Sequence, residues 1–171
     1  MLVYWCEDLI PIGYTDSDFQ LDLDFKKSTS GCVFTLRGGA ITWRSVKQSC
    51  IADSTMEAEY IATYEAAKEA VWLKKFISDL GVVKMEQVPI TLFCDNSGVV
   101  AQSKDARNHK KGNNIERKYH IIRDIIAHGD VVVAMIESAN NIADPFTKAL
   151  PQRTFESHLE GMGVKLVHNS L

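Results

Sequence analysis

Long apolar runs are missing from this chain of 171 residues. No stretch approaches the roughly 20 apolar residues that a membrane-spanning helix needs, and the acidic pair Glu7-Asp8 disfavours a signal peptide. The four cysteines, Cys6, Cys32, Cys50 and Cys94, show no C-x-x-C spacing, and no histidines follow them at the intervals of a zinc finger. We therefore expect no structural zinc site, no disulfide framework, and a soluble intracellular protein with reduced thiols.

Excess charge of one sign is likewise absent, since the formal net charge is only -3. Its distribution is uneven, however, because seven basic residues face three acidic ones between Lys104 and Asp124. A solvated helix face would explain such a stretch, and so would a surface that holds nucleic-acid phosphates. The candidates for phosphate contacts in this stretch are Lys110, Lys111, Arg117 and Lys118.

Local patterns predict one α/β domain without internal repeats or linkers. β-branched and aromatic residues favour strands over 10–14, 29–36, 40–45, 90–94 and 131–136. Apolar residues at three- and four-residue steps predict helices over 54–80 and 116–127, with a short helix over 97–101 and a last one beginning near Ile142. This order predicts a three-layer domain in which helices flank a mixed sheet.

Four acidic residues occur where these predicted elements begin or end. Asp16 follows the first strand, Glu59 lies in the long helix, Asp95 follows strand 90–94, and Asp144 lies in the first turn of the last helix. Carboxylates can hold two Mg²⁺ ions roughly 4 Å apart, which is the arrangement of a two-metal phosphodiester hydrolase. If the four side chains converge, the sequence predicts such a nuclease site.

Glu59 is the acid that the helix pattern favours most. Glu57 has a structural role available, since Ser54 and Glu57 form the S-x-x-E pattern of a capping box. Glu59 instead shares a helix face with Ala62 and Ala66, which we expect to pack on the sheet. An unpaired carboxylate buried there would be costly unless a metal ion relieved it.

The other three acids have structural alternatives. Asp95 could simply cap the next helix, and Asp144 would be favoured by the helix dipole in any first turn. Asp16 is preferred only by its position after the strand, over its neighbours Asp18, Asp22 and Asp24. Trp43 and Gln48 could contact a sugar or base, although a tryptophan in the core is an equal alternative. No histidine is a strong candidate for a general base.

Several segments, in this order, resemble the ribonuclease H domain that ends the polyprotein of copia-type retrotransposons, especially those of plants. They are Gly-Tyr-Thr-Asp-Ser-Asp (13–18), Lys-Ser-Thr-Ser-Gly (27–31), Ser-Thr-Met-Glu-Ala-Glu-Tyr (54–60), Cys-Asp-Asn (94–96) and Asn-Ile-Ala-Asp-Pro-Phe-Thr-Lys (141–148). The resemblance covers about 12–164, so we expect the domain there, with an N-terminal extension over 1–11 and a C-terminal tail over 165–171.

The resemblance implies a ribonuclease H-like fold with a five-stranded mixed sheet whose first three strands are antiparallel. It places the family's catalytic, metal-binding carboxylates on Asp16, Glu59, Asp95 and Asp144. The implied reaction is hydrolysis of the RNA strand of an RNA–DNA hybrid with two Mg²⁺ ions, for which Mn²⁺ may substitute, leaving a 3′-hydroxyl and a 5′-phosphate. Residues placed to read the 2′-hydroxyl, by position alone, are Ser17, Asp18, Asn96 and Ser97.

The family normally acts joined to a reverse-transcriptase polymerase, in a cytoplasmic virus-like particle or the nucleus. Some residues depart from its pattern. The loop 137–140 lacks the histidine found in cellular ribonucleases H, copia relatives often have Lys-His-Ile in place of 113–115, and Phe19 replaces a common tryptophan. A catalytically weak or inactive remnant that only binds nucleic acid is therefore the competing hypothesis, and a nuclease or transposase acting on DNA is a third.

Overall fold

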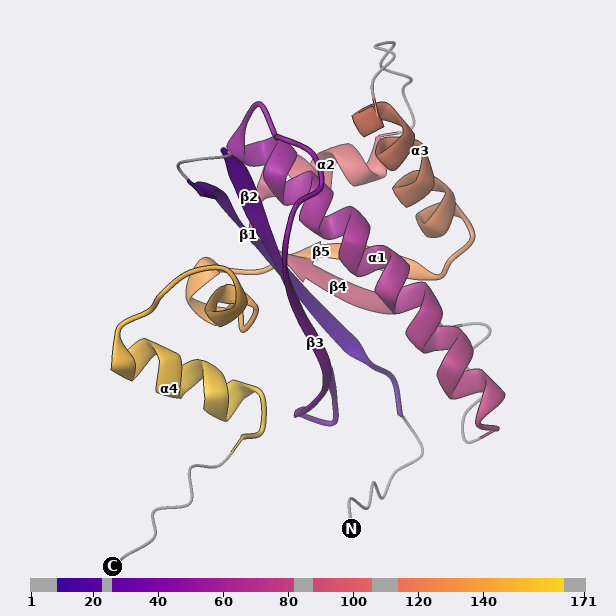
Figure 1. Ribbon diagram of the computed structural model, residues 1–171. Helices are drawn as coiled ribbons and strands as arrows, with labels where there is room; N and C mark the ends of the chain where they lie inside the picture. The colour runs from indigo at the N-terminus through magenta and orange to yellow at the C-terminus, as the bar shows by residue number, and fades with distance from the viewer. Residues whose placement is uncertain (1–8, 23–25, 82–87, 106–113, 165–171) are drawn as a thin grey trace, which may run out of the picture.

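The computed structural model describes residues 9–22, 26–81, 88–105 and 114–164. Figure 1 shows its elements, which in chain order are β1 (Ile12–Asp22), β2 (Lys27–Leu36), β3 (Gly39–Lys47), α1 (Thr55–Asp79), β4 (Ile90–Cys94), α2 (Ser97–Lys104), α3 (Asn114–Ala127), β5 (Val131–Met135), the 3₁₀ turns η1 (Ser138–Asn140) and η2 (Asp144–Phe146), and α4 (Gln152–Gly161). No helix within these ranges is long and apolar enough to cross a membrane.

The five strands form one mixed sheet in the order β3-β2-β1-β4-β5. β1, β2 and β3 pair antiparallel, whereas β4 runs parallel to both β1 and β5. The predicted fold, a mixed sheet with three antiparallel strands first, is therefore confirmed. The domain bounds proposed from the sequence stay a prediction, because 1–8 and 165–171 lie outside the described residues.

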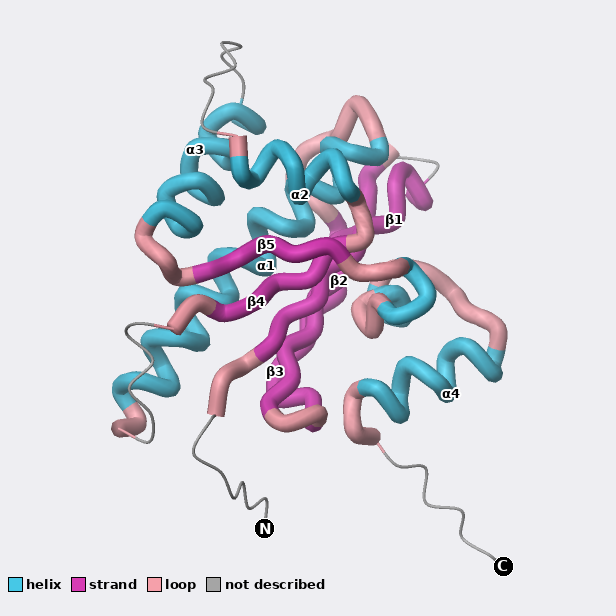
Figure 2. Tube along the Cα trace, turned by 180° about the vertical axis from the view of Figure 1, so that it is seen from behind, coloured by secondary structure: helices cyan, strands magenta, loops and turns pink. Residues whose placement is uncertain are grey.

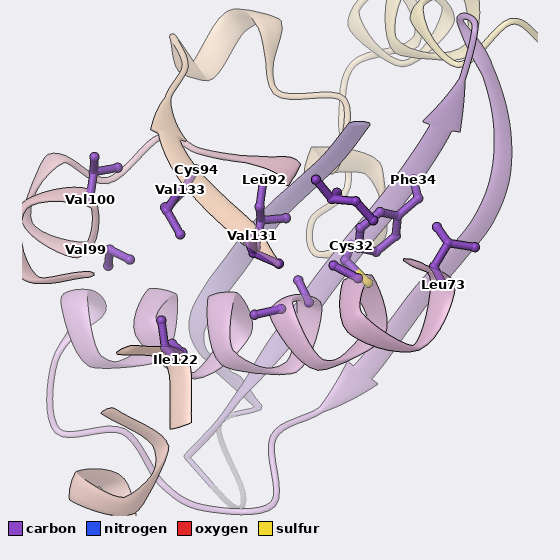
Figure 3. Close-up of a cluster of buried hydrophobic side chains, with 14 of the residues drawn as sticks. Cys32, Phe34, Leu73, Leu92, Cys94, Val99, Val100, Ile122, Val131 and Val133 are labelled. Carbon is purple, nitrogen blue, oxygen red and sulfur yellow. The ribbon is translucent and has the colours of Figure 1, made fainter. Parts of the chain in front are cut away.

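Helices cover the two faces of this sheet (Figures 1 and 2). Successive strand residues point to opposite faces, so Cys32 and Phe34 of β2 join the core under α1 while Val33 packs with Ile142 and Ala143 on the other side. Figure 3 shows the first core, where β2, β4 and β5 meet α1 and Ile122 of α3. The C-terminal segment with η2 and α4 thus forms the third layer.

The first turn of α1 has the predicted cap with one difference. Ser54 Oγ accepts a hydrogen bond from the Glu57 amide at 3.2 Å. The Glu57 carboxylate accepts from the amide of Asp53, one residue before the N-cap that the sequence predicted. Glu57 is therefore occupied by the helix end, which leaves Glu59 as the acid that faces inward.

Two predicted boundaries were wrong near the acidic residues. β1 does not stop before Asp16, because β2 continues to pair with it, opposing Gly31 to Asp16 and Thr29 to Asp18. The last helix does not begin near Ile142 either. Asn141 binds the Ala143 amide and, through its own Nδ2, the carbonyl of Thr15 at 3.0 Å, so the chain follows the sheet in short 3₁₀ turns. An α-helix begins only at Gln152.

Candidate active site

β1 and β4 bring Asp16 and Asp95 together. The last pair in their parallel register is Thr15 opposite Cys94. The residue that follows each of these is an aspartate, so Asp16 and Asp95 are neighbours. Asp16 belongs to β1 while Asp95 has already left β4. Asp95 therefore follows the end of its strand, as the sequence predicted, whereas Asp16 lies within β1.

The C-terminal segment brings Asp144 to the same place. Asn141 holds this segment to Thr15, and Thr147 Oγ1 donates a hydrogen bond to Asp16 Oδ2. Gly31 of β2 makes the approach possible, because a Cβ there would lie only 2.7 Å from Thr147 Cγ2. Asp144 is consequently buried in a 3₁₀ turn beside the sheet, with 8% of its surface exposed.

Glu59 reaches the cluster from α1. Its side chain is buried, and Oε1 accepts a hydrogen bond of 3.2 Å from the backbone amide of Ser17, directly after Asp16. Oε2 is also buried and has no hydrogen-bond partner among the described residues. A carboxylate oxygen without a partner in such surroundings is costly, and a bound cation would relieve that cost.

All four candidate acids therefore converge on the segment Thr15–Ser17. Asp16, Asp95 and Asp144 each offer a carboxylate oxygen within 4.8 Å of the others. Glu59 and Asp95 form a second such group, in which Cys94 Sγ is the third atom. Asp95 belongs to both groups, so the arrangement has the donors to hold two cations on either side of one shared aspartate.

The electrostatics favour binding of positive charge. Burial raises the pKa of Asp16 to about 6, an effect that the Thr147 hydrogen bond and the Lys148 ammonium oppose. Burial, with Asp16 and Asp95 as further causes, raises the pKa of Glu59 to about 8. Burial thus makes these carboxyls resist ionisation, and a divalent cation would favour their charged forms.

Lys148 places a positive charge beside Asp16 and Asp144. Its Nζ lies 3.5 Å from Asp16 Oδ2 and 3.4 Å from Asp144 Oδ1, and the two carboxylates raise the pKa of Lys148 against the effect of burial. About a third of its side chain remains exposed. The ammonium therefore bridges two of the proposed ligands from the solvent side.

Comparison with known proteins gives two kinds of similarity. No protein-family model matches the chain. The chain is 40% identical over 163 residues to the retrovirus-related Pol polyprotein of transposon TNT 1-94 from Nicotiana tabacum, aligning 95% of its own length with 12% of that protein. It is 29% identical over 155 residues to the Pol polyprotein of transposon RE1 from Arabidopsis thaliana, aligning 91% of its length with 10% of that protein.

Solved structures share the fold. LC11-RNase H1, solved in complex with an RNA/DNA hybrid, superposes with a TM-score of 0.59 at 20% identity, over 80% of this chain and 93% of that one. The foamy viral protease-reverse transcriptase, also solved with a hybrid, gives 0.59 at 16% identity over 86% of this chain and 20% of that one. The chain is homologous to a segment of plant retrotransposon Pol polyproteins and has the ribonuclease H fold.

Asp95 does not cap α2, which was the structural alternative to its role as a metal ligand. The N-cap of α2 is Asn96, whose Oδ1 accepts from the amides of Gly98 at 3.0 Å and Val99 at 3.2 Å. Asp95 is therefore not needed as a helix cap. Ser97 is exposed at the first position of α2, two residues after Asp95.

Two other candidates for nucleic-acid contact have different surroundings from those expected. Gln48 is fully buried, and its Nε2 donates to Ser30 Oγ and the Ala58 carbonyl. It joins β2 to α1 and is not on the surface that a nucleic acid could touch, so its assignment as a contact was wrong. Trp43 is 61% exposed on the edge strand β3, which excludes the core alternative.

The remaining candidates divide between described and undescribed segments. Ser17 and Asp18 lie on β1, where the Ser17 amide already binds Glu59. Arg117 is exposed on α3, and Lys118 Nζ lies 5.5 Å from the centroid of the Tyr64 ring. Lys110 and Lys111 lie outside the described residues.

Sequence reasoning missed the residues that hold the cluster together. Thr147 and Lys148 follow Asp144 by three and four positions, and Asn141 precedes it by three. The signal was present, since all three occur in the segment 141–148 that carries the family resemblance. Only the acid in that segment was singled out, because carboxylates are recognisable ligands and a threonine hydroxyl is not.

Proposed function

We propose that the chain hydrolyses the RNA strand of RNA–DNA hybrids, with Asp16, Glu59, Asp95 and Asp144 as ligands of two divalent metal ions. The convergence of these four side chains on Thr15–Ser17 carries the proposal. Their hard oxygen donors fit Mg²⁺, and Mn²⁺ is a suitable substitute. Glu59 Oε2, which is buried without a hydrogen-bond partner among the described residues, is an oxygen that a bound cation would contact.

The ions, when bound, would activate a water molecule and stabilise the leaving oxygen of the phosphodiester. The protein's own part is to hold the ligands in place. The Ser17 amide orients Glu59, Thr147 orients Asp16, and Asn141 fixes the turn that carries Asp144. Lys148 keeps two carboxylates close before the metal ions arrive and could afterwards face the negative phosphate.

A hybrid is the substrate that the relatives favour. Two structures of this fold were solved with an RNA/DNA hybrid, one of them a viral reverse transcriptase. Reading of the 2′-hydroxyl would come from groups near the cluster, for which we propose Ser17, Asp18, Asn96 and Ser97. Trp43, Arg117 and Lys118 would contact the strands farther from the cut, by stacking and by phosphate contacts.

The context we propose is a polyprotein that also carries a reverse-transcriptase polymerase. The chain spans between 10% and 12% of the first two polyproteins that it matches. Removal of the RNA strand after reverse transcription would be its part in the retrotransposon cycle, in a cytoplasmic virus-like particle or the nucleus. The copia type of the element is part of this proposal.

End-labelled hybrid, single-stranded RNA and double-stranded DNA should be compared as substrates in Mg²⁺, Mn²⁺ and chelator. We expect metal-dependent cleavage of the RNA strand of the hybrid alone. Asp95→Asn should abolish it, while Asp124→Asn, the same change on the exposed side of α3, should retain it. Hybrid binding without cleavage by folded protein would favour the inactive remnant, and cleavage of DNA would favour the third hypothesis.

A further inference from the structure

Cys94 places a sulfur atom at the edge of the carboxylate cluster. It is the last residue of β4, lies opposite Met135 of β5, and is fully buried in the core that Figure 3 shows. Its Sγ and one carboxylate oxygen each from Glu59 and Asp95 all lie within 4.8 Å of one another. Of the two ligand groups that share Asp95, one is therefore all oxygen and the other contains sulfur.

A sulfur ligand changes which cation such a group prefers. Mg²⁺ selects oxygen, whereas thiolate sulfur selects softer ions such as Zn²⁺ and Cd²⁺. A tetrahedral zinc ion bound by one sulfur and two carboxylate oxygens needs those atoms roughly 3.5 Å apart. The three atoms of this group lie within 4.8 Å of one another, so binding such an ion requires them to move inward.

The donors of this group are incompletely used by the protein. Glu59 Oε2 is buried without a hydrogen-bond partner among the described residues. Cys94 Sγ receives only long contacts, 3.5 Å from the Asn96 amide and 3.9 Å from Thr63 Oγ1. The Asn96 amide points its N–H at the sulfur, whereas the Thr63 hydroxyl donates its one proton to the Glu59 carbonyl at 2.8 Å. Glu59 and Cys94 thus each keep an atom that the described residues satisfy weakly or not at all.

We propose that Glu59, Cys94 and Asp95 bind a thiophilic divalent cation, with Zn²⁺ or Cd²⁺ as the fitting ions. Binding releases the thiol proton to solvent and places the ion on two of the carboxylates assigned above to the catalytic metals. Glu59 and Asp95 cannot bind the thiophilic cation and the catalytic Mg²⁺ at the same time, because both ions need the same oxygens. The thiophilic cation therefore prevents Mg²⁺ from binding where it supports cleavage. This part of the inference rests on the proposed function, and it makes the site inhibitable by zinc.

Cys32 provides a matched comparison for Cys94. Both thiols are buried in the same core, and burial raises the pKa of each to about 12. Among the described residues, only Cys94 belongs to a group with metal-binding spacing. A role in core packing alone would make the two cysteines equivalent toward a metal ion, whereas the proposed site makes them different.

Cd²⁺ titration tests the site without any need for turnover. Sulfur-to-cadmium charge-transfer absorbance should rise to one equivalent in the unaltered chain, persist in Cys6→Ala, Cys32→Ala and Cys50→Ala, and disappear in Cys94→Ala. Cys94→Ser serves as a second variant if the alanine variant fails to fold by circular dichroism. An unchanged signal in a folded Cys94 variant overturns the proposal.

Zinc inhibition of hybrid cleavage at fixed Mg²⁺ tests the consequence. The inhibitory Zn²⁺ concentration should rise about tenfold or more in the Cys94 variant and stay unchanged in Cys32→Ala. Equal inhibition of both variants contradicts exclusion of Mg²⁺ through this site. If the chain cleaves no hybrid at all, the proposed function fails, while the cadmium absorbance still decides whether the ion site exists.

Discussion

Thr147 Oγ1 donates a hydrogen bond to Asp16 Oδ2, joining the turn that carries Asp144 to the middle of β1. The same hydroxyl lies 3.1 Å from the Asp144 carbonyl, and the side chain is 5% exposed. One buried threonine thus connects two of the proposed metal ligands, which are far apart in the sequence. The geometry of the carboxylate cluster therefore depends on Thr147, although an uncharged threonine is not one of the proposed metal ligands.

Thr147→Val should weaken the metal site while preserving the shape of the side chain. Without the hydroxyl, Asp16 loses the bond that orients it, so we expect half-saturating Mg²⁺ to rise about 10- to 100-fold. Metal titration of hybrid cleavage and calorimetry of Mn²⁺ binding without substrate measure this shift. Thr147→Ser keeps the hydroxyl and should therefore bind Mg²⁺ almost as tightly as the unaltered chain. Equal defects in both variants would contradict the orienting role.

Gly31→Ala should push η2 away from the sheet. The added Cβ would lie 2.7 Å from Thr147 Cγ2 and 3.0 Å from Phe146 Cβ. We expect a loss of about 1–3 kcal/mol in the free energy of unfolding, as in other overpacked sites, together with weaker metal binding. Urea denaturation checks the first effect. Gly39→Ala is the control, because its nearest contact would be at 3.7 Å, and a similar loss there would refute the steric explanation.

Glu59→Gln should abolish cleavage and yet stabilise the metal-free protein. The variant removes a buried carboxyl that must take up a proton on folding near neutral pH and whose Oε2 has no partner among the described residues, so the free energy of unfolding in chelator should rise by about 1–3 kcal/mol. Chemical denaturation in chelator and in Mn²⁺ measures the gain and its loss when metal is present. Glu57→Gln, two residues earlier in the cap, should give no gain, and a gain there would point to a general charge effect.

The metal-free protein should lose stability as pH rises from about 4 to 8. Burial raises the pKa of Glu59 to about 8 and of Asp16 to about 6. The folded state therefore binds protons more tightly than the unfolded state, so the contribution is fully present at acid pH and is lost as pH passes through the raised values.

Denaturation at pH 5 and pH 8, in chelator, provides the measurement. The unaltered chain should show a larger fall in unfolding free energy than Glu59→Gln, and divalent metal should reverse most of that difference. Identical pH dependence in the two proteins would show that Glu59 ionises normally in the fold. Groups far from Glu59 cancel in this comparison because both proteins share them, whereas Asp16 and Asp95 interact with Glu59 and belong to the measured difference.

Local patterns were sufficient to predict most elements of the fold. Strand 90–94, helix 54–80 and the order of elements follow from apolar periodicity and turn residues, which act over a few neighbouring positions. The inward orientation of Glu59 was also predictable, since its helix face and the cap at Glu57 are both local features. The four acids were chosen from 22 acidic residues by such positions and by resemblance to a family.

Interactions between distant segments determined the rest. Asn141 bonds to Thr15, and Thr147 to Asp16, across more than a hundred residues, and these contacts keep the segment after β5 in 3₁₀ turns where local pattern favoured a helix. Burial of Gln48 and the sulfur of Cys94 beside Glu59 depend on strand register and helix packing in the same way. The sequence by itself determined which chemical groups were available. Tertiary structure decided which of them meet, because their proximity depends on how sheet and helices pack.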